Sequence, residues 1–196
     1  YQPWEAVIVD NGTTEPQALA LLESLAADPR FRILRDPRPF NYSALCNAAV
    51  AAARGEVVVL LNNDMVVDRR FLRPLLEGFG PSTFAVSSQI YLQDASARRE
   101  ETGKTTAHFR RGMIDFTHCA LDGRILERRY YPTLWAGGGS SAFNRERFLA
   151  LGGFQEIYSP AYVEDTDLSY QAWKFGWEVL FAPESIVYHK HRASSS

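Results

Sequence analysis

Residues 56–64 read EVVVLLNND, an apolar run that stops at three polar residues. A continuous, mostly β-branched run is typical of a strand buried on both faces, as in a parallel sheet. Ligands of open α/β sheets bind beyond the carboxyl ends of such strands. Asp64 is therefore the first candidate for holding a metal or a phosphate group. The same polar residues also favour a turn, because their side chains hydrogen-bond to nearby backbone. This stretch alone leaves both interpretations open.

The length and composition suit a single domain. A chain of 196 residues can build one well-formed core. We expect the domain to cover residues 1–192, followed by a polar tail at 193–196 that needs no structure. A hydrophobic fraction of 46% and a charged fraction of 22% are ordinary for a globular chain, and a net charge of −2 disfavours nucleic acid as a partner.

Cysteine usage and hydropathy bear on location. Cys46 and Cys119 lie far apart in the sequence, and reduced, structural thiols are the better interpretation, which fits a cytoplasmic chain. No apolar run approaches the roughly 20 residues that span a bilayer, and the start lacks a signal-peptide pattern. We therefore expect a cytoplasmic protein without a transmembrane segment. Association with the inner face of the membrane would need a partner or residues outside this chain.

Strand and helix patterns alternate along the first half of the chain. The expected strands are residues 5–10, 31–34 and 56–61, and the expected helices are residues 16–27, 41–54 and 68–78. We expect Thr14 to cap the first helix, Gly55 to end the second and Pro74 to kink the third. The alternation predicts a parallel α/β sheet that contains all three strands.

The second half has a looser pattern. We expect a strand at residues 83–91, then loops and a β-ribbon between residues 92 and 131, with a hairpin turn at Asp122-Gly123. The elements expected after it are ordered structure at 134–143, a short helix at 145–151, a helix at 165–175 and strands at 177–181 and 185–189.

Three polar sites stand out from this core-building pattern. They are Asp10-Asn11 after the first strand, residues 62–64 after a later one, and the sequence Glu-Asp-Thr-Asp at 164–167 before the last helix. A helix N-terminus favours negative charge, and Asp165 as a simple N-cap is the structural alternative at the third site. His189 is by default a hydrogen-bonded or exposed strand histidine, with metal ligation as the alternative.

Together these pieces resemble the family 2 inverting glycosyltransferases. The resemblance rests on six short motifs that occur in the family's order: VDNGT at 9–13, FNYSA at 40–44 with Asn47, GE at 55–56 leading to LNND at 61–64, GGF at 152–154, EDTDLS at 164–169, and PES at 183–185 leading to His189. It implies the GT-A fold of nucleotide-diphospho-sugar transferases. That fold has a mixed, mostly parallel central sheet flanked by helices in a three-layer sandwich.

The resemblance implies a divalent metal, Mn²⁺ or Mg²⁺, bound by Asp64 and bridging the donor diphosphate. His189 matches a histidine that some members add as a second protein ligand. Both ions accept oxygen ligands, and Mn²⁺ tolerates imidazole better. Asn62 stands where many relatives have an acid that faces ribose or metal, so we expect a weakened metal site.

The resemblance also implies the remaining roles. Asp165 matches the general base of an inverting displacement, with Glu164 and Asp167 orienting the site or binding acceptor hydroxyls. The implied nucleotide-binding residues are Asp10, Asn11, Asn41, Asn47, Asn62 and Asn63.

Two features would lie beside the sugars. Gly138 and Gly139 belong to a segment that aligns with the loop beside the donor sugar, although a bulged strand entry explains glycine there almost as well. Trp135 could stack on an acceptor sugar, with a place in the core as the alternative.

Two absences qualify this picture. Relatives generally have a strand and a helix before the VDNGT motif, so the chain looks truncated at its N-terminus. The fragment need not be active alone, and an unpaired sheet edge invites a homodimer or additional domains. The Gln-X-X-Arg-Trp motif of processive members does not occur, which favours transfer of a single sugar.

We therefore expect a metal-dependent inverting glycosyltransferase. It would move a hexosyl or deoxyhexosyl group from a UDP- or dTDP-sugar to a glycan or lipid-linked acceptor, in bacterial cell-surface polysaccharide synthesis. One alternative is a noncatalytic module that binds sugar nucleotides or glycans within a larger protein. Another is a sugar-nucleotidyltransferase, but the glycine-rich, basic phosphate loop that it needs near its start does not occur.

Overall fold

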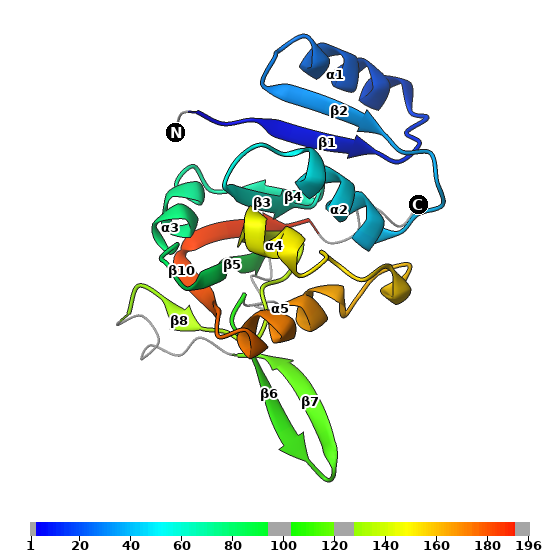
Figure 1. Ribbon diagram of the computed structural model, residues 1–196. Helices are drawn as coiled ribbons and strands as arrows, with labels where there is room; N and C mark the ends of the chain where they lie inside the picture. The colour runs from blue at the N-terminus through cyan, green and yellow to red at the C-terminus, as the bar shows by residue number, and fades with distance from the viewer. Residues whose placement is uncertain (1–2, 94–102, 120–127, 191–196) are drawn as a thin grey trace.

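A computed structural model describes residues 3–93, 103–119 and 128–190 of the chain (Figure 1). Its largest sheet has six strands, in the order β3-β9-β5-β10-β4, with β8 also paired to β10. These strands are β3 (Val57–Leu61), β4 (Met65–Val67), β5 (Thr83–Leu92), β8 (Tyr131–Pro132), β9 (Ser140–Asn144) and β10 (Glu178–His189). β5 and β10 are parallel neighbours, and β9 runs antiparallel between β3 and β5. The sheet is therefore mixed, as expected.

The first two strands form a sheet of their own. β1 (Ala6–Asp10) and β2 (Phe31–Arg35) pair in parallel, as predicted. The prediction that the strand of residues 56–61 joins them is wrong for the described residues, because β3 is the edge strand of the larger sheet, where it pairs with β9 and with neither β1 nor β2. Periodicity identifies strands but not their hydrogen-bonding neighbours, and this neighbour comes from far along the chain.

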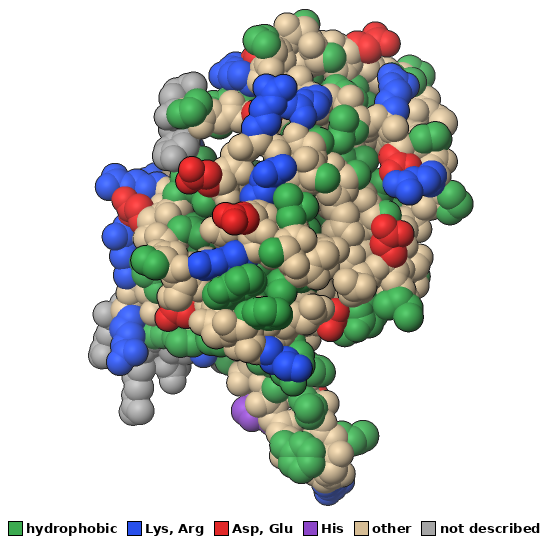
Figure 2. Space-filling model, viewed as in Figure 1, with side chains coloured by type: hydrophobic (Ala, Val, Ile, Leu, Met, Phe, Trp, Pro, Cys, Tyr) green, Lys and Arg blue, Asp and Glu red, His purple; other side chains and the backbone are tan. Residues whose placement is uncertain are grey.

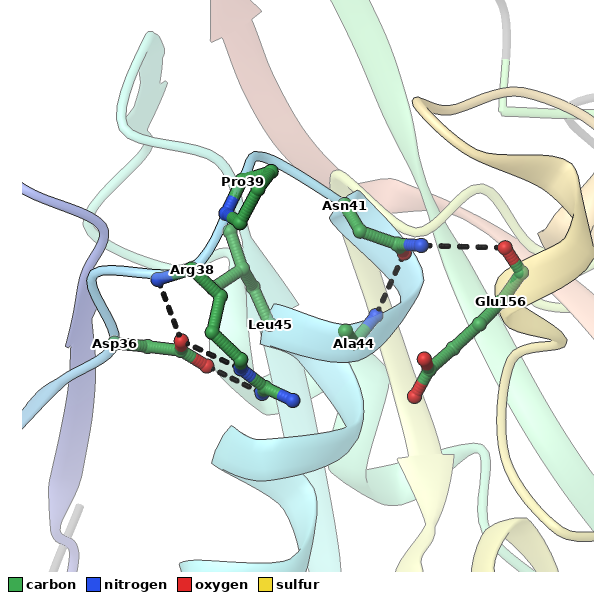
Figure 3. A pocket seen from close by; sticks show the side chains of 7 residues that line it. All are labelled: Asp36, Arg38, Pro39, Asn41, Ala44, Leu45 and Glu156. Carbon is green, nitrogen blue, oxygen red and sulfur yellow. Dashed lines mark hydrogen bonds and ion pairs between the residues drawn. The ribbon is translucent and has the colours of Figure 1, made fainter.

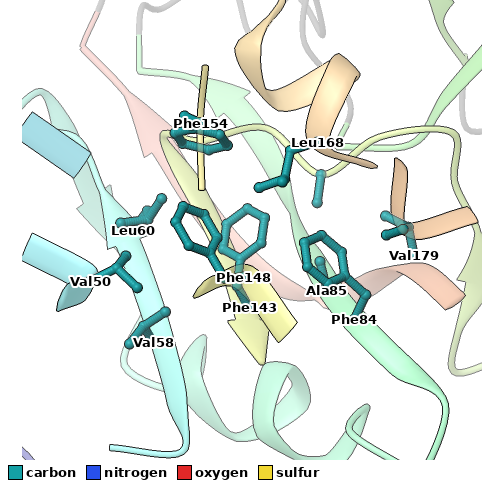
Figure 4. Close-up of a cluster of buried hydrophobic side chains, with 12 residues drawn as sticks. Val50, Val58, Leu60, Phe84, Ala85, Phe143, Phe148, Phe154, Leu168 and Val179 are labelled. Carbon is teal, nitrogen blue, oxygen red and sulfur yellow. The ribbon is translucent and has the colours of Figure 1, made fainter. Parts of the chain in front are cut away.

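Helices pack on both faces of the large sheet and give three layers. One core cluster joins Val58 and Leu60 of β3 to α2 (Tyr42–Ala52), α4 (Arg145–Ala150) and α5 (Glu164–Lys174), around a group of phenylalanines (Figure 4). A second cluster packs Leu75 of α3 (Leu72–Glu77) against the opposite face, beside Val57 and Val59. Both faces of β3 are thus covered, which is why its sequence is apolar without alternation.

Helix ends differ from the predictions in several places. Helix α1 (Pro16–Ala26) is capped by Glu15, without a side-chain bond, rather than by Thr14, because proline occupies its first position. Asn41 caps α2 through its side chain, and this helix ends at Ala52, before Gly55. α3 begins only at Leu72, so Pro74 lies in its first turn, where its missing N–H breaks no bond and it forms no kink.

The second half also has corrections. Strands β6 (Thr105–Arg110) and β7 (Met113–His118) form a hairpin that turns at Arg111-Gly112, while the turn predicted at Asp122-Gly123 lies outside the described residues. The two strands expected at the end are one strand, β10, with a register shift between Ala182 and Ile186. The tail at 193–196 is also outside the described residues.

Two further observations concern the described part of the chain. None of its helices has the length and apolarity needed to cross a bilayer. Cys46 and Cys119 form no disulfide with each other. Burial raises the pKa of Cys46 to about 12, so this thiol stays protonated and acts as a small apolar side chain in the core.

Candidate functional site

Sheet register brings Asp64 and His189 together. β4 follows the end of β3 after a short turn and pairs antiparallel with β10, so that Met65 lies opposite His189. The adjacent backbone bond runs from the N–H of Lys190 to the carbonyl of Asp64, at 2.9 Å. The Oδ2 atom of Asp64 then lies 3.1 Å from Nε2 of His189, and each side chain is 16% exposed.

This pair fits part of a metal site. The Oδ1 atom of Asp64 is buried and has no hydrogen-bond partner among the described residues, which leaves a carboxylate oxygen available. A carboxylate with an imidazole is a donor set that suits Mn²⁺ and that Mg²⁺ accepts less readily. Within the described ranges no three His, Cys, Asp or Glu side chains gather for a metal ion. Among the described residues, Asp64 and His189 are thus two candidate ligands, and a metal ion here would need its other ligands from elsewhere.

Asn62 is held beside this pair by two neighbours. Its backbone N–H donates to the carbonyl of Gly139 at 3.0 Å, and its Oδ1 accepts a hydrogen bond from the hydroxyl of Tyr42 at 3.0 Å. A Cβ atom on Gly139 would lie 2.8 Å from Nδ2 of Asn62, so the close approach requires glycine. The sequence reasoning did not single out Tyr42, although it lies inside the FNYSA motif.

A second group of carboxylates lies at the N-terminus of α5. Val163, in the left-handed conformation with φ of 77°, precedes the helix, so Asp165 is not its N-cap. The Oδ2 atom of Asp165 accepts from the N–H of Gly138 at 3.2 Å, and its Oδ1 accepts from the N–H of Thr166 at 2.7 Å. Burial raises the pKa of Asp165, and these hydrogen bonds offset part of that rise.

Glu164 is more enclosed than Asp165. Its side chain is 4% exposed, and its Oε2 atom has no hydrogen-bond partner among the described residues. Burial raises the pKa of this carboxyl, and the negative charge of Asp165 adds to the rise. A buried carboxylate without full hydrogen bonding destabilises the folded state when it ionises.

Tyr42 and the segment 137–139 join the two groups. The N–H of Gly138 reaches Asp165, while the carbonyl of Gly139 reaches Asn62. Burial is the main cause that raises the pKa of Tyr42, and the charges of Asp165 and Glu164 add to it, so its phenol stays protonated and donates. The strand-end and helix-end groups therefore lie on either side of one short glycine segment.

Asp10 and Asn11 end β1 near a small pocket. Asp10 accepts from the N–H of Thr13 at 2.9 Å, and hydrogen bonds from the side chain and the backbone of Thr13 hold its pKa below the usual value. The amide of Asn11 donates to the carbonyls of Asp36 and Arg38, at 2.6 and 2.8 Å. Asp36 and Arg38 line a pocket of about 190 Å³ that Asn41 also lines (Figure 3). The segment after β1 thus supports one wall of a pocket that contains a predicted residue.

Some predicted residues have other contacts. The side-chain amide of Asn47 donates to the carbonyl of Phe154 at 2.8 Å and accepts from the N–H of Phe154 at 2.9 Å. These two bonds connect α2 to the GGF motif. Trp135 is 9% exposed and meets the rings of Phe116 and His118 edge-on, which places it in the core. Asp167 accepts from Gln171 one turn along α5, and Asn63 is exposed in the turn before β4.

Comparisons with known proteins identify the family of the chain. The model of the family described as "Glycosyl transferase family 2" matches residues 1–148. The uncharacterized protein y4gI of Sinorhizobium fredii (strain NBRC 101917 / NGR234) is 32% identical over 99% of this chain and 22% of its own length. The O-antigen biosynthesis protein RfbC of Myxococcus xanthus is 29% identical over 99% of this chain and 15% of its own length. The chain thus spans about a fifth of these curated relatives.

Solved structures share the fold. The structure of GalNAc-T7 with UDP, GalNAc and Mn²⁺ superposes with a TM-score of 0.73 at 19% identity, covering 98% of this chain and 39% of that one. The mannosyltransferase PcManGT from Pyrobaculum calidifontis, in complex with GDP-Man and Mn²⁺, gives a TM-score of 0.67 at 18% identity, covering 97% and 49%. Both support the same three-layer arrangement.

Proposed function

Because the chain belongs to glycosyl transferase family 2, we propose that it is the catalytic domain of a metal-dependent inverting transferase. It moves one hexosyl or deoxyhexosyl group from a UDP- or dTDP-sugar to a saccharide or related acceptor. The observation that carries this proposal is the placing of Asp64 with His189 and of Asp165 with Glu164 on either side of the segment 137–139.

Asp64 and His189 would hold the divalent metal. When bound, such an ion supplies positive charge to the diphosphate that departs, which is worth several kcal/mol in comparable enzymes. The Oδ1 atom of Asp64, which has no hydrogen-bond partner in the described part of the chain, supports this assignment. So do the two structural neighbours, one in complex with UDP, GalNAc and Mn²⁺ and the other with GDP-Man and Mn²⁺.

Asp165 would act as the general base. Inversion requires a carboxylate on the face opposite the leaving group, where it takes the proton of the acceptor hydroxyl as that oxygen attacks the anomeric carbon. The bonds from Gly138 and Thr166 fix the orientation of Asp165, and its raised pKa makes it a better proton acceptor than an ordinary aspartate. Base catalysis of this kind contributes about 10²–10⁴-fold.

The other predicted residues would serve either the nucleotide-sugar donor or the acceptor saccharide. Asp10, Asn11, Asn41, Asn62 and Asn63 would contact the nucleotide, with Asn47 supporting them through its bonds to Phe154. Glu164 and Asp167 would orient the base or bind acceptor hydroxyls. Gly138 and Gly139 would let the backbone approach the donor sugar, and Trp135 would lie on the acceptor side.

The relationship to the O-antigen biosynthesis protein supports a role in bacterial cell-surface polysaccharide assembly. This chain covers 15% of the length of that relative. The acceptor that the whole protein uses is therefore also a proposal.

Thermal unfolding with UDP-, dTDP- and GDP-sugars, with and without Mn²⁺, tests the proposal. We expect a UDP- or dTDP-sugar to raise the melting temperature of the wild type only when Mn²⁺ is present. Asp64→Asn should lose that rise, because it removes the charged ligand and keeps the shape. The matched control Asp115→Asn, on the exposed β7 strand, should keep it.

Two results would count against the proposal. Stabilisation by nucleotide sugar that is the same with and without Mn²⁺ would support the noncatalytic binding module instead. An equal metal-dependent rise in the wild type and in Asp64→Asn would remove Asp64 from the site.

A further inference from the structure

The β6–β7 hairpin has one apolar face. In an antiparallel pair, residues opposite each other share a face. Phe109 lies opposite Ile114, and Ala107 lies opposite Phe116, which puts these four side chains on one side of the hairpin. The opposite side carries Thr106, His108, Arg110, Met113, Asp115 and Thr117. We call Ala107, Phe109, Ile114 and Phe116 the hairpin's apolar face.

This face is exposed although its residues are large. Phe109 is 78% exposed, Ile114 60% and Phe116 51%, and Met113 beside the turn is 72% exposed. The hairpin projects away from the three-layer body (Figure 1). Hydrophobic side chains gather near its end in the space-filling view (Figure 2). Contiguous apolar surface of this kind marks an interaction site.

The turn of the hairpin adds positive charge to the apolar residues. Arg110 and Arg111 are consecutive and exposed, and Asp115 is the one acid between residues 105 and 118. Arg111 has a φ of 51° and Gly112 a φ of 82°. A two-residue turn of this type favours asparagine or aspartate at its first position, so local turn preference does not explain an arginine there.

We propose that the hairpin's apolar face docks on the surface of a bilayer that contains anionic lipids, while Arg110 on the polar side and Arg111 in the turn interact with the headgroups. Apolar side chains flanked by basic ones are the pattern of segments that lie in the membrane interface. Arginines at such a position gain from the negative surface potential, while their aliphatic stems stay among apolar groups.

The shape of the hairpin favours a lipid surface over a protein partner. A two-stranded ribbon that projects from the body can lie on a flat surface with one whole face. A protein partner, or a second copy of this chain, would need a complementary groove and acidic groups to meet the arginines. A bilayer with anionic headgroups offers both an apolar interior and a negatively charged surface.

Docking there would also place the candidate site near the membrane. The base of the apolar face meets the core at Trp135, whose ring contacts Phe116. Trp135 lies two positions before Gly137 in the segment that reaches Asp165. The inference stands apart from the proposed function, because vesicle binding needs no donor, metal or turnover.

Co-sedimentation of the purified chain with vesicles tests the proposal. We use vesicles of phosphatidylcholine alone and of phosphatidylcholine mixed with phosphatidylglycerol. The wild type should bind the mixed vesicles more tightly, and added salt should weaken that binding. Arg110→Gln with Arg111→Gln should weaken it by about fivefold for each arginine removed. Phe109→Ser with Ile114→Ser should weaken binding to mixed vesicles by about tenfold or more.

Matched controls show whether a loss of vesicle binding is specific to the hairpin. Leu21→Ser and Arg69→Gln change an exposed apolar and an exposed basic residue away from the hairpin, and both should bind like the wild type. Circular dichroism checks that each variant is folded, and Phe109→Trp adds a second measurement, the quenching of its fluorescence by brominated lipids.

Equal binding by the wild type and both hairpin variants would overturn the proposal, as would the absence of binding to either vesicle. Self-association that Phe109→Ser with Ile114→Ser abolishes, without vesicle binding, would show that the face joins two copies of the chain.

Discussion

Asp64 and Asp165 are the same type of residue in two different surroundings. Asp64, just beyond the end of β3, faces a ring nitrogen of His189, and its other oxygen is buried without a hydrogen-bond partner among the described residues. Asp165, in the first turn of α5, is held by two backbone N–H groups, and burial raises its pKa. The first arrangement suits a cation and the second suits a proton. Local environment, and not residue type, separates the two roles.

The largest expected effect comes from removing the carboxylate of Asp165 while Asp64 is kept. Asp165→Asn keeps the hydrogen-bond acceptor for Gly138 and removes the proton-accepting group. We expect kcat to fall by about 10²–10⁴-fold while metal-dependent binding of the donor is retained. Transfer assays and thermal shifts measure the two quantities. Transfer at the wild-type rate would show that the base lies elsewhere.

The link between the two regions gives the next prediction. Tyr42→Phe removes the donor to the Oδ1 atom of Asn62, and the loss of this part-buried hydrogen bond should cost about 0.5–1.5 kcal/mol of unfolding free energy. The metal-dependent affinity for the nucleotide sugar should fall as well, because Asn62 begins the turn that carries Asp64. Urea unfolding and calorimetric titration measure these losses.

Tyr170→Phe is the matched control, because Tyr170 is exposed on α5. If Tyr42→Phe lowers stability and leaves donor binding unchanged, the strand-end group is independent of Tyr42.

Glu164, at the N-terminus of α5, should make the stability of the fold depend on pH. The folded-state pKa of Glu164 lies above its unfolded value of 4.5, so its contribution is fully present below that pH. The contribution is lost as pH rises through the folded pKa, at about 1.4 kcal/mol for each unit between the two values. Glu164→Gln should therefore flatten the fall in stability over that window.

Chemical unfolding at a series of pH values measures the slope. Glu23→Gln, on the exposed side of α1, should leave it unchanged. If the stability of Glu164→Gln changes with pH as steeply as that of the wild type, Glu164 is not the source of this pH dependence.

The sequence predicted local features well and long-range pairing poorly. β3 was predicted because an apolar run requires cover on both faces, and His189 because it ends a motif in the family's order. The antiparallel pairing of β3 with β9 was missed, because nothing within residues 57–61 encodes a partner at 140–144. Val163 as a left-handed residue before α5 was missed too, since β-branched side chains rarely adopt positive φ.

Within the candidate site the same division holds. The carboxylates and His189 were found from residue type and motif order. Tyr42 was not, because its role depends on a fold contact with Asn62 that local spacing does not reveal. The β6–β7 hairpin was expected only as a ribbon somewhere between residues 92 and 131, and the turn at Arg111-Gly112 uses residues that turn preferences do not favour.

The pairing of β4 with β10 has a consequence for how the site assembles. Asp64 and His189 are 125 residues apart in sequence, and they meet only when Met65 lies opposite His189. Side chains alternate along a strand, so a slip of one residue would turn the histidine to the other face of the sheet. The pair therefore closes a long loop of the chain, and a ligand that binds both side chains would stabilise the completed fold over any partly paired form.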